Sequence, residues 1–235
     1  MLNGKSYIVT GASSGIGKAI TQSLLALGAN VLGIGRHVKT MESQNNFQAI
    51  EIDFEKPQLY ENKIKELVRS LGEINGCICA AGVGRFGALE QFSFAQMQSI
   101  MHINFTAHSL LVRHVIPNLK QQKSGDIIFI GSEAALDGGR NGAMYCASKF
   151  ALRGFALSLR EECSKSGLRV SLINPGMVKT PFFKDLHFKP GDDEVNYVIA
   201  EDVANAVKLI LTSREGTVFD EIVLSPLKKV IKFNT

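Results

Sequence analysis

Two side chains in one short stretch have the types and the spacing needed for acid–base chemistry. The chain reads Tyr145-Cys146-Ala147-Ser148-Lys149, so on a helix the phenol and the ammonium project from one face. Ser132 lies upstream, where a strand is predicted to end. A reaction that protonates a carbonyl oxygen while hydride reaches the carbon needs a positioned proton donor of this kind.

The electrostatic attraction between these two groups is large enough to matter. A free phenol has a pKa near ~10, which is about 3 units, or roughly 4 kcal/mol, from easy proton exchange at pH 7. One ammonium about 4 Å away supplies roughly 4 kcal/mol at an effective dielectric constant of about 20. We expect Lys149, helped by an oxidised nicotinamide, to bring the pKa of Tyr145 near neutrality. The alternatives are structural: an interface tyrosine, a solvated lysine and a capping serine.

A glycine-rich turn follows the first predicted strand and opens a helical pattern, and it reads Thr10-Gly11-Ala12-Ser13-Ser14-Gly15-Ile16-Gly17. Gly11 permits a tight turn, Gly15 lets backbone approach a pyrophosphate, and Gly17 lets the helix pack close to the strand. The free N–H groups of the helix would face the phosphates. We predict a dinucleotide site here, and a plain glycine-rich turn is the alternative. The predicted contacts are Gly11, Ser13, Ser14, Gly15, Ile16 and Gly17.

The residues after the second predicted strand indicate which dinucleotide binds. A site for NAD normally carries an acidic residue here, which holds the ribose hydroxyls. This chain instead has Gly35 and then Arg36, with His37 and Lys39 close by. A guanidinium can hold a 2′-phosphate through two charge-assisted hydrogen bonds. We therefore predict NADP(H) as the cofactor, with a solvated arginine as the alternative.

Two further strand ends are predicted to border the cofactor. After the third strand, Asp53 and Phe54 are placed to meet the adenine, with the carboxylate accepting from its amine. An aspartate that caps the next helix is the alternative for Asp53. After the fourth strand, the small residues Ala81 and Gly82 would let a cofactor lie against backbone.

Strand-like and helix-like segments alternate along the whole chain. Apolar runs predict strands over residues 6–10, 29–34, 47–53, 74–81, 126–131, 169–174 and 219–224. Amphipathic stretches predict helices over 15–27, 58–70, 94–121, 143–164 and 201–211. This order favours one α/β domain over residues 1–235, a doubly wound parallel sheet of about seven strands with helices on both faces. Residues 36–46 have room for one or two helical turns, and 180–200 form an irregular region expected to border the substrate.

The composition excludes several classes of protein. The chain has 235 residues, 45% of them hydrophobic, with a net charge of +4 whose basic residues are scattered, so no nucleic-acid surface is indicated. No apolar run approaches the ~18 residues of a membrane span, and no signal peptide is visible, so we expect a cytoplasmic protein that does not bind membranes. Cys77 and Cys79 lack a second pair at zinc-like spacing, so no metal is predicted and buried thiols are favoured.

In combination, these motifs resemble the classical short-chain dehydrogenase/reductase family along essentially the whole chain. The family's glycine loop matches Thr10–Gly17, its Tyr-x-x-x-Lys pair matches Tyr145 and Lys149, and its serine and helix asparagine match Ser132 and Asn104. The resemblance implies a single Rossmann-type domain and a homodimer or homotetramer. Tyr145 would then be the general acid in reduction, Lys149 would lower its pKa and bind ribose, Ser132 would bind the substrate oxygen and Asn104 would hold a water. The loop that holds the nicotinamide carboxamide would be Pro175, Gly176, Val178 and Thr180.

The chain departs from the family where Asn-Asn-Ala-Gly usually follows the fourth strand, because it reads Cys79-Ala80-Ala81-Gly82. Any hydrogen bonds of those amides must be replaced or absent, so we expect a modest loss of local order. A looser likeness links the segments 188–193 and 221–226, and the Gly-Arg pair, to the NADP-dependent 3-hydroxy acid (serine) dehydrogenase group.

The predicted function is an NADP(H)-dependent oxidoreductase that acts on a carbonyl or secondary alcohol, without a metal. A regulator that binds NADPH without catalysis is the alternative, and an intact set of catalytic residues argues against it. The substrate stays open. The segment 180–200 and a few residues outside it offer an apolar rim and cations that could attract a carboxylate. The apolar residues are Phe86, Met144, Phe182, Phe183, Phe188 and Tyr197, and the cations are Arg140, Lys184 and Lys189.

Overall fold

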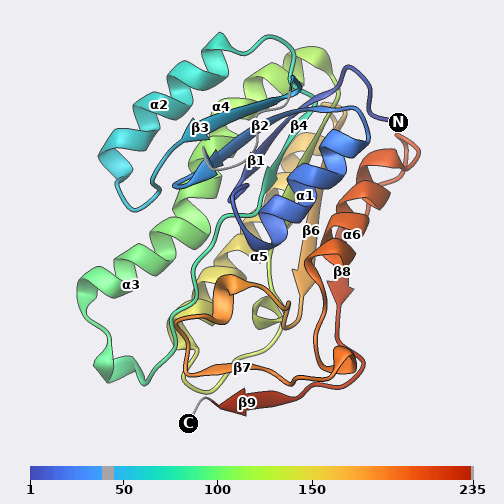
Figure 1. Cartoon of the computed structure of the whole chain (residues 1–235). Helices are drawn as coiled ribbons and strands as arrows, with labels where there is room; N and C mark the ends of the chain where they lie inside the picture. The colour runs from blue at the N-terminus through green and yellow to red at the C-terminus, as the bar shows by residue number, and fades with distance from the viewer. Residues whose placement is uncertain (39–44, 234–235) are drawn as a thin grey trace.

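The core of the protein is a parallel sheet of seven strands in the order β3-β2-β1-β4-β5-β6-β8. A computed structural model describes residues 1–38 and 45–233 of the chain (Figure 1). The strands are β1 (Ser6–Thr10), β2 (Asn30–Gly35), β3 (Phe47–Glu51), β4 (Gly76–Cys79), β5 (Gly125–Ile130), β6 (Leu168–Pro175) and β8 (Glu221–Leu224). The doubly wound α/β fold predicted from the sequence is confirmed.

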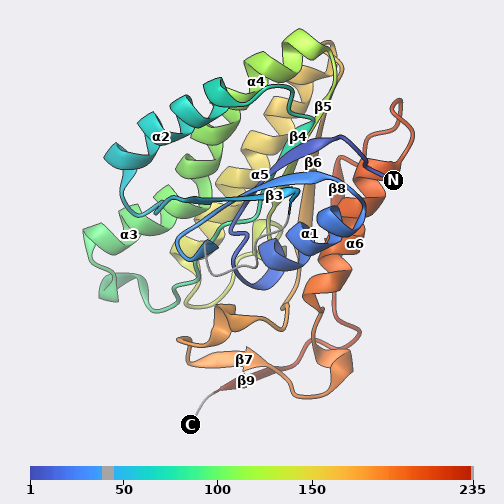
Figure 2. The ribbon, with the colours of Figure 1, turned by 45° about the horizontal axis from the view of Figure 1, so that its top comes forward.

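Helices cover both faces of this sheet, as the views in Figures 1 and 2 show. On one face, α2 (Pro57–Ser70), α4 (Ala107–Gln122) and α5 (Ala143–Ser164) bury their apolar sides in one hydrophobic cluster. On the other face, α1 (Gly15–Ala26) and α6 (Ala200–Thr212) close a second cluster. The central strands β4 and β5 are buried along their whole length, which explains their nearly continuous apolar sequence. Among the described residues, no helix is both long and apolar enough to cross a membrane.

The helix predicted over 94–121 is interrupted, which corrects the prediction of one regular helix. The structure has α3 (Phe94–Met101), a π-helical turn at His102–Thr106 and then α4. Apolar periodicity does not reveal such a turn because it shifts the pattern by only one residue. The turn carries Asn104, which belongs to the candidate site described below.

A small antiparallel ribbon was missed by the sequence analysis. The strands β7 (Phe188–Pro190) and β9 (Ile231–Phe233) pair with each other, away from the main sheet. Three-residue strands are too short to show a period, and their pairing joins segments about 40 residues apart. The irregular region 180–200 contains β7 and two single helical turns, Pro181–Phe183 and Glu194–Asn196.

The other predicted strands and helices agree with the structure to within two residues at each end. The helical turns expected within 36–46, and the contribution of Lys39, fall largely or wholly on residues 39–44, which lie outside the described residues.

Candidate active site

The glycine loop after β1 has the geometry of a close approach between helix and strand. Gly11 and Gly15 have φ of +70° and +50°, the left-handed region that favours glycine. A Cβ placed on Gly17 would lie 2.2 Å from the Gly11 carbonyl oxygen, so no side chain fits there. The roles predicted for these glycines in the turn and in helix packing are therefore supported by the backbone.

The first turn of α1 is available to an anion. Ser14 is the N-cap of α1 and makes no side-chain capping hydrogen bond. Thr180 lies directly against this turn, because a Cβ on Gly15 would be 3.3 Å from the Thr180 Cβ. Thr180 is thus the residue after β6 that the structure brings to the glycine loop, which carries Ser13 and Ile16. Pro175 ends β6, Gly176 lies next to Pro226 and Glu133, and Val178 bridges to Val198.

The end of β4 is held by hydrogen bonds with β1 and α4. The Thr10 hydroxyl accepts hydrogen bonds from the backbone N–H groups of Ala80 and Ala81, each at 3.0 Å. His108, which is fully buried on α4, contacts the Ala81 carbonyl oxygen through Nε2 at 2.8 Å. Burial lowers the pKa of His108 to about 4, so the ring is neutral at pH 7 and donates this hydrogen bond. Residues from β1 and α4 therefore hold this strand end, where positions 79 and 80 have no side-chain amide.

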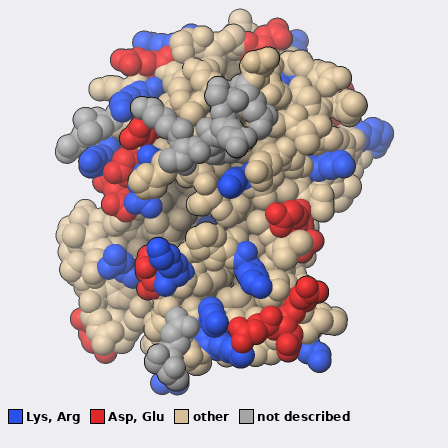
Figure 3. Space-filling model, viewed as in Figure 1, with Lys and Arg blue, Asp and Glu red and all other residues tan. Residues whose placement is uncertain are grey.

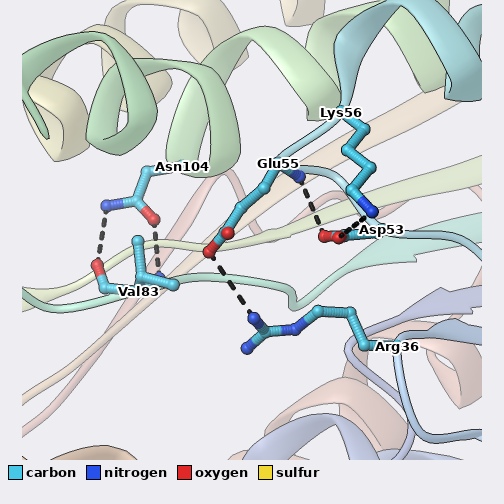
Figure 4. A network of polar contacts seen from close by, with 6 residues as sticks. All are labelled: Arg36, Asp53, Glu55, Lys56, Val83 and Asn104. Atoms are coloured by element: carbon cyan, nitrogen blue, oxygen red, sulfur yellow. Dashed lines mark hydrogen bonds and ion pairs between the residues drawn. The ribbon is translucent and has the colours of Figure 1, made fainter. Parts of the chain in front are cut away.

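The predicted adenine and phosphate end carries alternating charges, which Figure 4 shows. Arg36 lies 3.5 Å from the Glu55 carboxylate, and both side chains are about half exposed. Asp53 accepts a hydrogen bond from the Glu55 backbone N–H at 3.1 Å and lies 4.0 Å from the Lys56 ammonium. Asp53 therefore organises the turn before α2, which was the structural alternative for this residue, and one of its oxygens remains the candidate for adenine.

The prediction for Phe54 needs correction. Its side chain is buried and packs edge-on against Tyr60, with ring centroids 5.5 Å apart. It is part of the core cluster on the α2 face. Because the ring is in the core, only the backbone of Phe54 can face a nucleotide.

Tyr145 and Lys149 lie together at the carboxyl end of the sheet, but their electrostatics differ from the expectation. The Lys149 Nζ is 5.9 Å from the centre of the Tyr145 ring and donates a hydrogen bond to the Ile130 carbonyl oxygen at 3.1 Å. Burial raises the pKa of Tyr145 to about 12, although a hydrogen bond with Ser132 lowers it. Burial also lowers the pKa of Lys149 to about 8. Desolvation outweighs the attraction that the sequence-based estimate considered.

Ser132 is fixed by a chain of polar contacts that spans three elements. Its backbone N–H donates to Asn174 Oδ1 at 3.1 Å, and its hydroxyl accepts from the Ala134 N–H at 3.2 Å. Asn174 in turn contacts Glu221, which forms a two-pronged ion pair with Arg153 at 2.8 and 3.0 Å. These contacts leave the hydroxyl proton of Ser132 free to point at Tyr145 or at a substrate oxygen.

Asn104 uses its side chain to hold neighbouring elements. Its Oδ1 accepts from the Val83 N–H at 2.8 Å, and its Nδ2 donates to the Val83 carbonyl at 3.0 Å (Figure 4). The Nδ2 also donates to Ser148 Oγ at 3.0 Å. Both N–H donors are used, so the amide has no donor left for the water that the family resemblance implies. Gly82 borders Lys149 in this part of the site, because a Cβ on Gly82 would lie 3.8 Å from Lys149 Nζ.

Aromatic rings pack against the Tyr145 side chain. Phe86 packs against Tyr145 at 4.9 Å between ring centroids, and Phe182 does so at 6.0 Å. Phe183 and Phe188 extend this layer through contacts with Phe182 and Phe86. We call Phe86, Phe182, Phe183 and Phe188 the aromatic cap. Tyr145 is 8% exposed beneath it.

The other predicted rim residues lie beside this layer or outside it. Tyr197 contacts Lys179, with its hydroxyl 3.0 Å from the Lys179 Nζ. Lys184 and Lys189 line a cavity of about 380 Å³ together with Lys179, and Phe183 of the aromatic cap borders the same cavity. Met144 is half-buried and Arg140 is exposed. Among the predicted rim residues, the phenylalanines are therefore the ones that cover Tyr145.

Several residues that build the site were missed by sequence reasoning. His108 and Thr10 support β4, while Glu221 and Arg153 position Ser132 through Asn174. The sequence did hold a signal for His108, because this histidine stands one helical turn after Asn104. The pairing of Arg153 with Glu221 spans 68 positions in the chain and left no local signal.

Comparison with known proteins gives the same picture along most of the chain. A family model described as short chain dehydrogenase matches residues 5–190. The human 3-oxoacyl-[acyl-carrier-protein] reductase is 30% identical over 217 residues, which cover 89% of this chain and 92% of that protein. A metagenomic short-chain oxidoreductase solved in complex with NADP is 28% identical, with a TM-score of 0.81 and coverage of 97% and 99% of the two chains.

A more distant structure supports the looser likeness in fold. Serine dehydrogenase from Escherichia coli is 24% identical, with a TM-score of 0.80, and the match covers 93% of this chain and 96% of that one. At this identity the likeness concerns the fold alone.

Proposed function

The chain belongs to the short-chain dehydrogenase family, and on that premise we propose that it is an NADP(H)-dependent oxidoreductase for a carbonyl or secondary alcohol substrate. The observation that carries the proposal is the Tyr145 phenol, which is hydrogen-bonded to Ser132 and lies beside Lys149. The same side of the sheet carries the glycine loop and Thr180. Proton donor and nucleotide cradle thus meet at the strand ends, where ligands bind in sheets of this kind.

The residues present fit a dinucleotide. The left-handed glycines and the uncapped first turn of α1 offer N–H groups to a pyrophosphate. Arg36 offers a guanidinium to a 2′-phosphate, and Glu55 is the carboxylate that such a phosphate would replace. Gly82 leaves room beside Lys149, whose ammonium would bind a ribose. Bound NADPH would supply the hydride that reaches the carbonyl carbon.

The protein's own groups handle the proton. In reduction, Tyr145 donates its phenolic proton to the substrate oxygen, while Ser132 donates a hydrogen bond to the same oxygen. A pKa of about 12 keeps the phenol protonated at pH 7, which suits a proton donor. In oxidation the phenol must first lose its proton, which requires positive charge from Lys149 and the oxidised nicotinamide. The aromatic cap excludes water from this exchange.

Replacing the phenol tests the proposal directly. Tyr145→Phe should lower the rate of carbonyl reduction by about 10²- to 10⁴-fold, because general acid catalysis contributes that much. Its dissociation constant for NADPH should stay within about threefold of the wild type. Tyr197→Phe, which removes a phenol from the substrate region but not from the site, is the matched control. An unchanged rate in Tyr145→Phe would remove this residue from its role, and no observation in the structure favours the regulatory alternative.

The choice of NADPH has its own test. We expect a clear preference for NADPH over NADH in kcat/KM, and Arg36→Ala should reduce that preference by about tenfold, because a charge-assisted hydrogen-bonded pair is lost. Arg113→Ala, which removes a guanidinium paired with Glu61 far from the strand ends, is the control. A preference for NADH in the wild type would overturn this part of the proposal.

We also propose that the protein is a homodimer or homotetramer in solution. The helices α2, α4 and α5 border a cavity of about 670 Å³ whose lining includes Leu110, Ile116, Phe155 and Leu159. Phe150 on α5 is 43% exposed. Apolar surface of this kind on a sheet-covering helix is usually buried against a second subunit. Light scattering that gives the mass of a single chain would contradict the proposal.

A further inference from the structure

We propose that the C-terminal segment 225–233, which we call the strap, is part of the substrate site. It fastens the loop 184–197 so that the aromatic cap lies over Tyr145, and it thereby sets the affinity for the carbonyl substrate. The inference rests on the proposed function for its kinetic part, whereas its structural part is measurable without turnover.

Backbone contacts fasten the strap along the loop. Strand β9 pairs with β7 in antiparallel register, with Phe233 opposite Phe188 and Ile231 opposite Pro190. Beyond the strands, the Gly191 N–H donates to the Val230 carbonyl and the Lys228 N–H donates to the Val195 carbonyl, both at 2.9 Å. These contacts reach across the loop from 188 to 195.

Side chains fasten the strap at both of its ends. Near β9, Lys232 pairs with Asp192, and the Phe233 ring stacks on His187 at 6.2 Å. Figure 3 shows acidic and basic side chains next to one another at this lower end of the molecule. At the other end, the Lys229 Nζ lies 2.6 Å from Glu133 Oε2. Glu133 follows Ser132 directly, so the strap bridges the loop and the catalytic serine's own turn.

The contacts continue from the strap to the reacting phenol. Phe188 of β7 packs edge-on against Phe86 at 4.9 Å, and Phe86 packs against Tyr145 at the same distance. Phe188 also contacts Phe183 at 5.9 Å. The position of β7, which β9 pairs with, therefore determines where the aromatic cap lies.

The contacts that hold the strap are weak enough to be broken and formed again. Ile231 and Phe233 are 54% and 68% exposed, so β9 buries little apolar surface. A two-stranded ribbon alone is marginally stable, and exposed ion pairs change an equilibrium by about fivefold at most. A substrate has to reach a phenol that is 8% exposed, so the cap must move for it to enter. Elements that move in binding come from this low-stability range.

The strap is also outside the part of the chain that the family model describes. The match ends at residue 190, whereas the strap begins at 225. The glycine loop and the catalytic residues lie inside the match. The match to that family model therefore does not depend on the residues of the strap.

Two variants and a matched control test the strap. A variant that ends at Leu227 should show a KM for a reducible carbonyl raised about tenfold or more, with the dissociation constant for NADPH within about twofold of the wild type. Lys229→Met should raise KM by roughly 2- to 5-fold, because it removes one exposed ion pair. Lys228→Met changes the same charge one residue away and leaves the ion pair intact, so it should behave as the wild type. Lys229→Arg should restore the wild-type KM.

Hydrogen–deuterium exchange supplies a readout that does not depend on activity. In the truncated variant, amides of 187–196 should exchange at least tenfold faster, while those of β5 stay unchanged. Unchanged exchange in 187–196 would overturn the inference, as would faster exchange with an unaltered KM. If the wild type reduces no carbonyl, the proposed function fails, and the exchange experiment still decides whether the strap holds the loop.

Discussion

The cofactor end and the substrate end of this molecule are built on different principles. Around the glycine loop, the close contacts involve the backbone. The Gly17 Cα faces the Gly11 carbonyl, and the Thr10 hydroxyl accepts from two backbone N–H groups at the end of β4. Around the substrate loop, the contacts are made by exposed side chains and a three-residue ribbon. The first region leaves no space for change, whereas the second can be altered residue by residue.

Under the proposed function, this difference separates the residues for chemistry from those for selectivity. Hydride and proton transfer need fixed distances, which suits the buried positions of Tyr145 and Lys149 on the long helix α5. Substrate choice needs a surface that opens, so it rests on loops held by weak contacts. Tyr145 belongs to both regions, because α5 positions its phenol and the aromatic cap covers its ring.

Of the changes that test this difference between the two regions, we expect the largest effect from adding one methyl group at Gly17, at the cofactor end. In Gly17→Ala the new Cβ would lie 2.2 Å from the Gly11 oxygen, so helix and loop must move apart. We expect NADPH binding to weaken more than tenfold and the free energy of unfolding to fall by about 3 kcal/mol, the upper range for overpacking. Gly72→Ala, where nothing lies within 4 Å, is the control and should change stability by less than about 0.5 kcal/mol.

Fluorescence titration with NADPH and urea unfolding would measure both effects. If Gly17→Ala bound NADPH as tightly as Gly72→Ala, the close approach at the glycine loop would not be required for binding.

A smaller effect is expected from the buried ammonium that joins the two regions. Burial lowers the pKa of Lys149 from 10.5 to about 8. Below pH 8 the folded and unfolded chains both bind this proton, and the folded chain bears the full cost of a buried charge. Between pH 8 and 10.5 the folded chain releases it first, so the unfolded chain binds more protons and stability rises with pH.

Lys149→Met removes this rise. Relative to the variant, the wild type should gain about 3 kcal/mol in the free energy of unfolding between pH 7 and 10.5. Urea unfolding at several pH values measures the difference, and Lys63→Met, an exposed lysine on α2, should run parallel to the wild type. A constant difference between wild type and Lys149→Met would mean that Lys149 is not desolvated as the structure indicates.

The same contrast explains how far the sequence could be interpreted alone. The strands of the sheet were predictable because burial on both faces leaves continuous apolar runs, as in β5. The glycine loop and the Tyr145–Lys149 pair were predictable because their geometry is local, within one turn or one helix face. The family resemblance supplied Asn104 and the loop after β6, which no local pattern would have indicated.

The features that sequence analysis did not predict depend on contacts between distant segments or on burial. The strap pairs with a loop about 40 residues away, and Arg153 reaches Glu221 across 68 positions. The inward position of Phe54 and the raised pKa of Tyr145 both follow from burial, which a list of neighbours along the chain does not contain. The attraction between Tyr145 and Lys149 was therefore estimated without the desolvation that opposes it.

The smallest expected effect needs no substitution, because it compares how salt changes amide exchange in the two regions. The sheet that carries the cofactor end and the strap each contain an ion pair. Asp126 with Arg169, at the edge of the sheet opposite the glycine loop, is nearly buried at 2.7 Å, and Lys232 with Asp192 is exposed in the strap. Salt shortens the screening length from about 10 Å at 0.1 M to about 3 Å at 1 M, and it weakens exposed pairs far more than buried ones. Amide exchange at 187–192 should therefore speed up about twofold over this range, after correction with an unstructured peptide. Exchange in β5, beside the buried pair, should not change. An equal response in the two regions would mean that the strap is held by the same kind of contact as the sheet, and the division of the molecule into a fixed cofactor end and a releasable substrate end would be wrong.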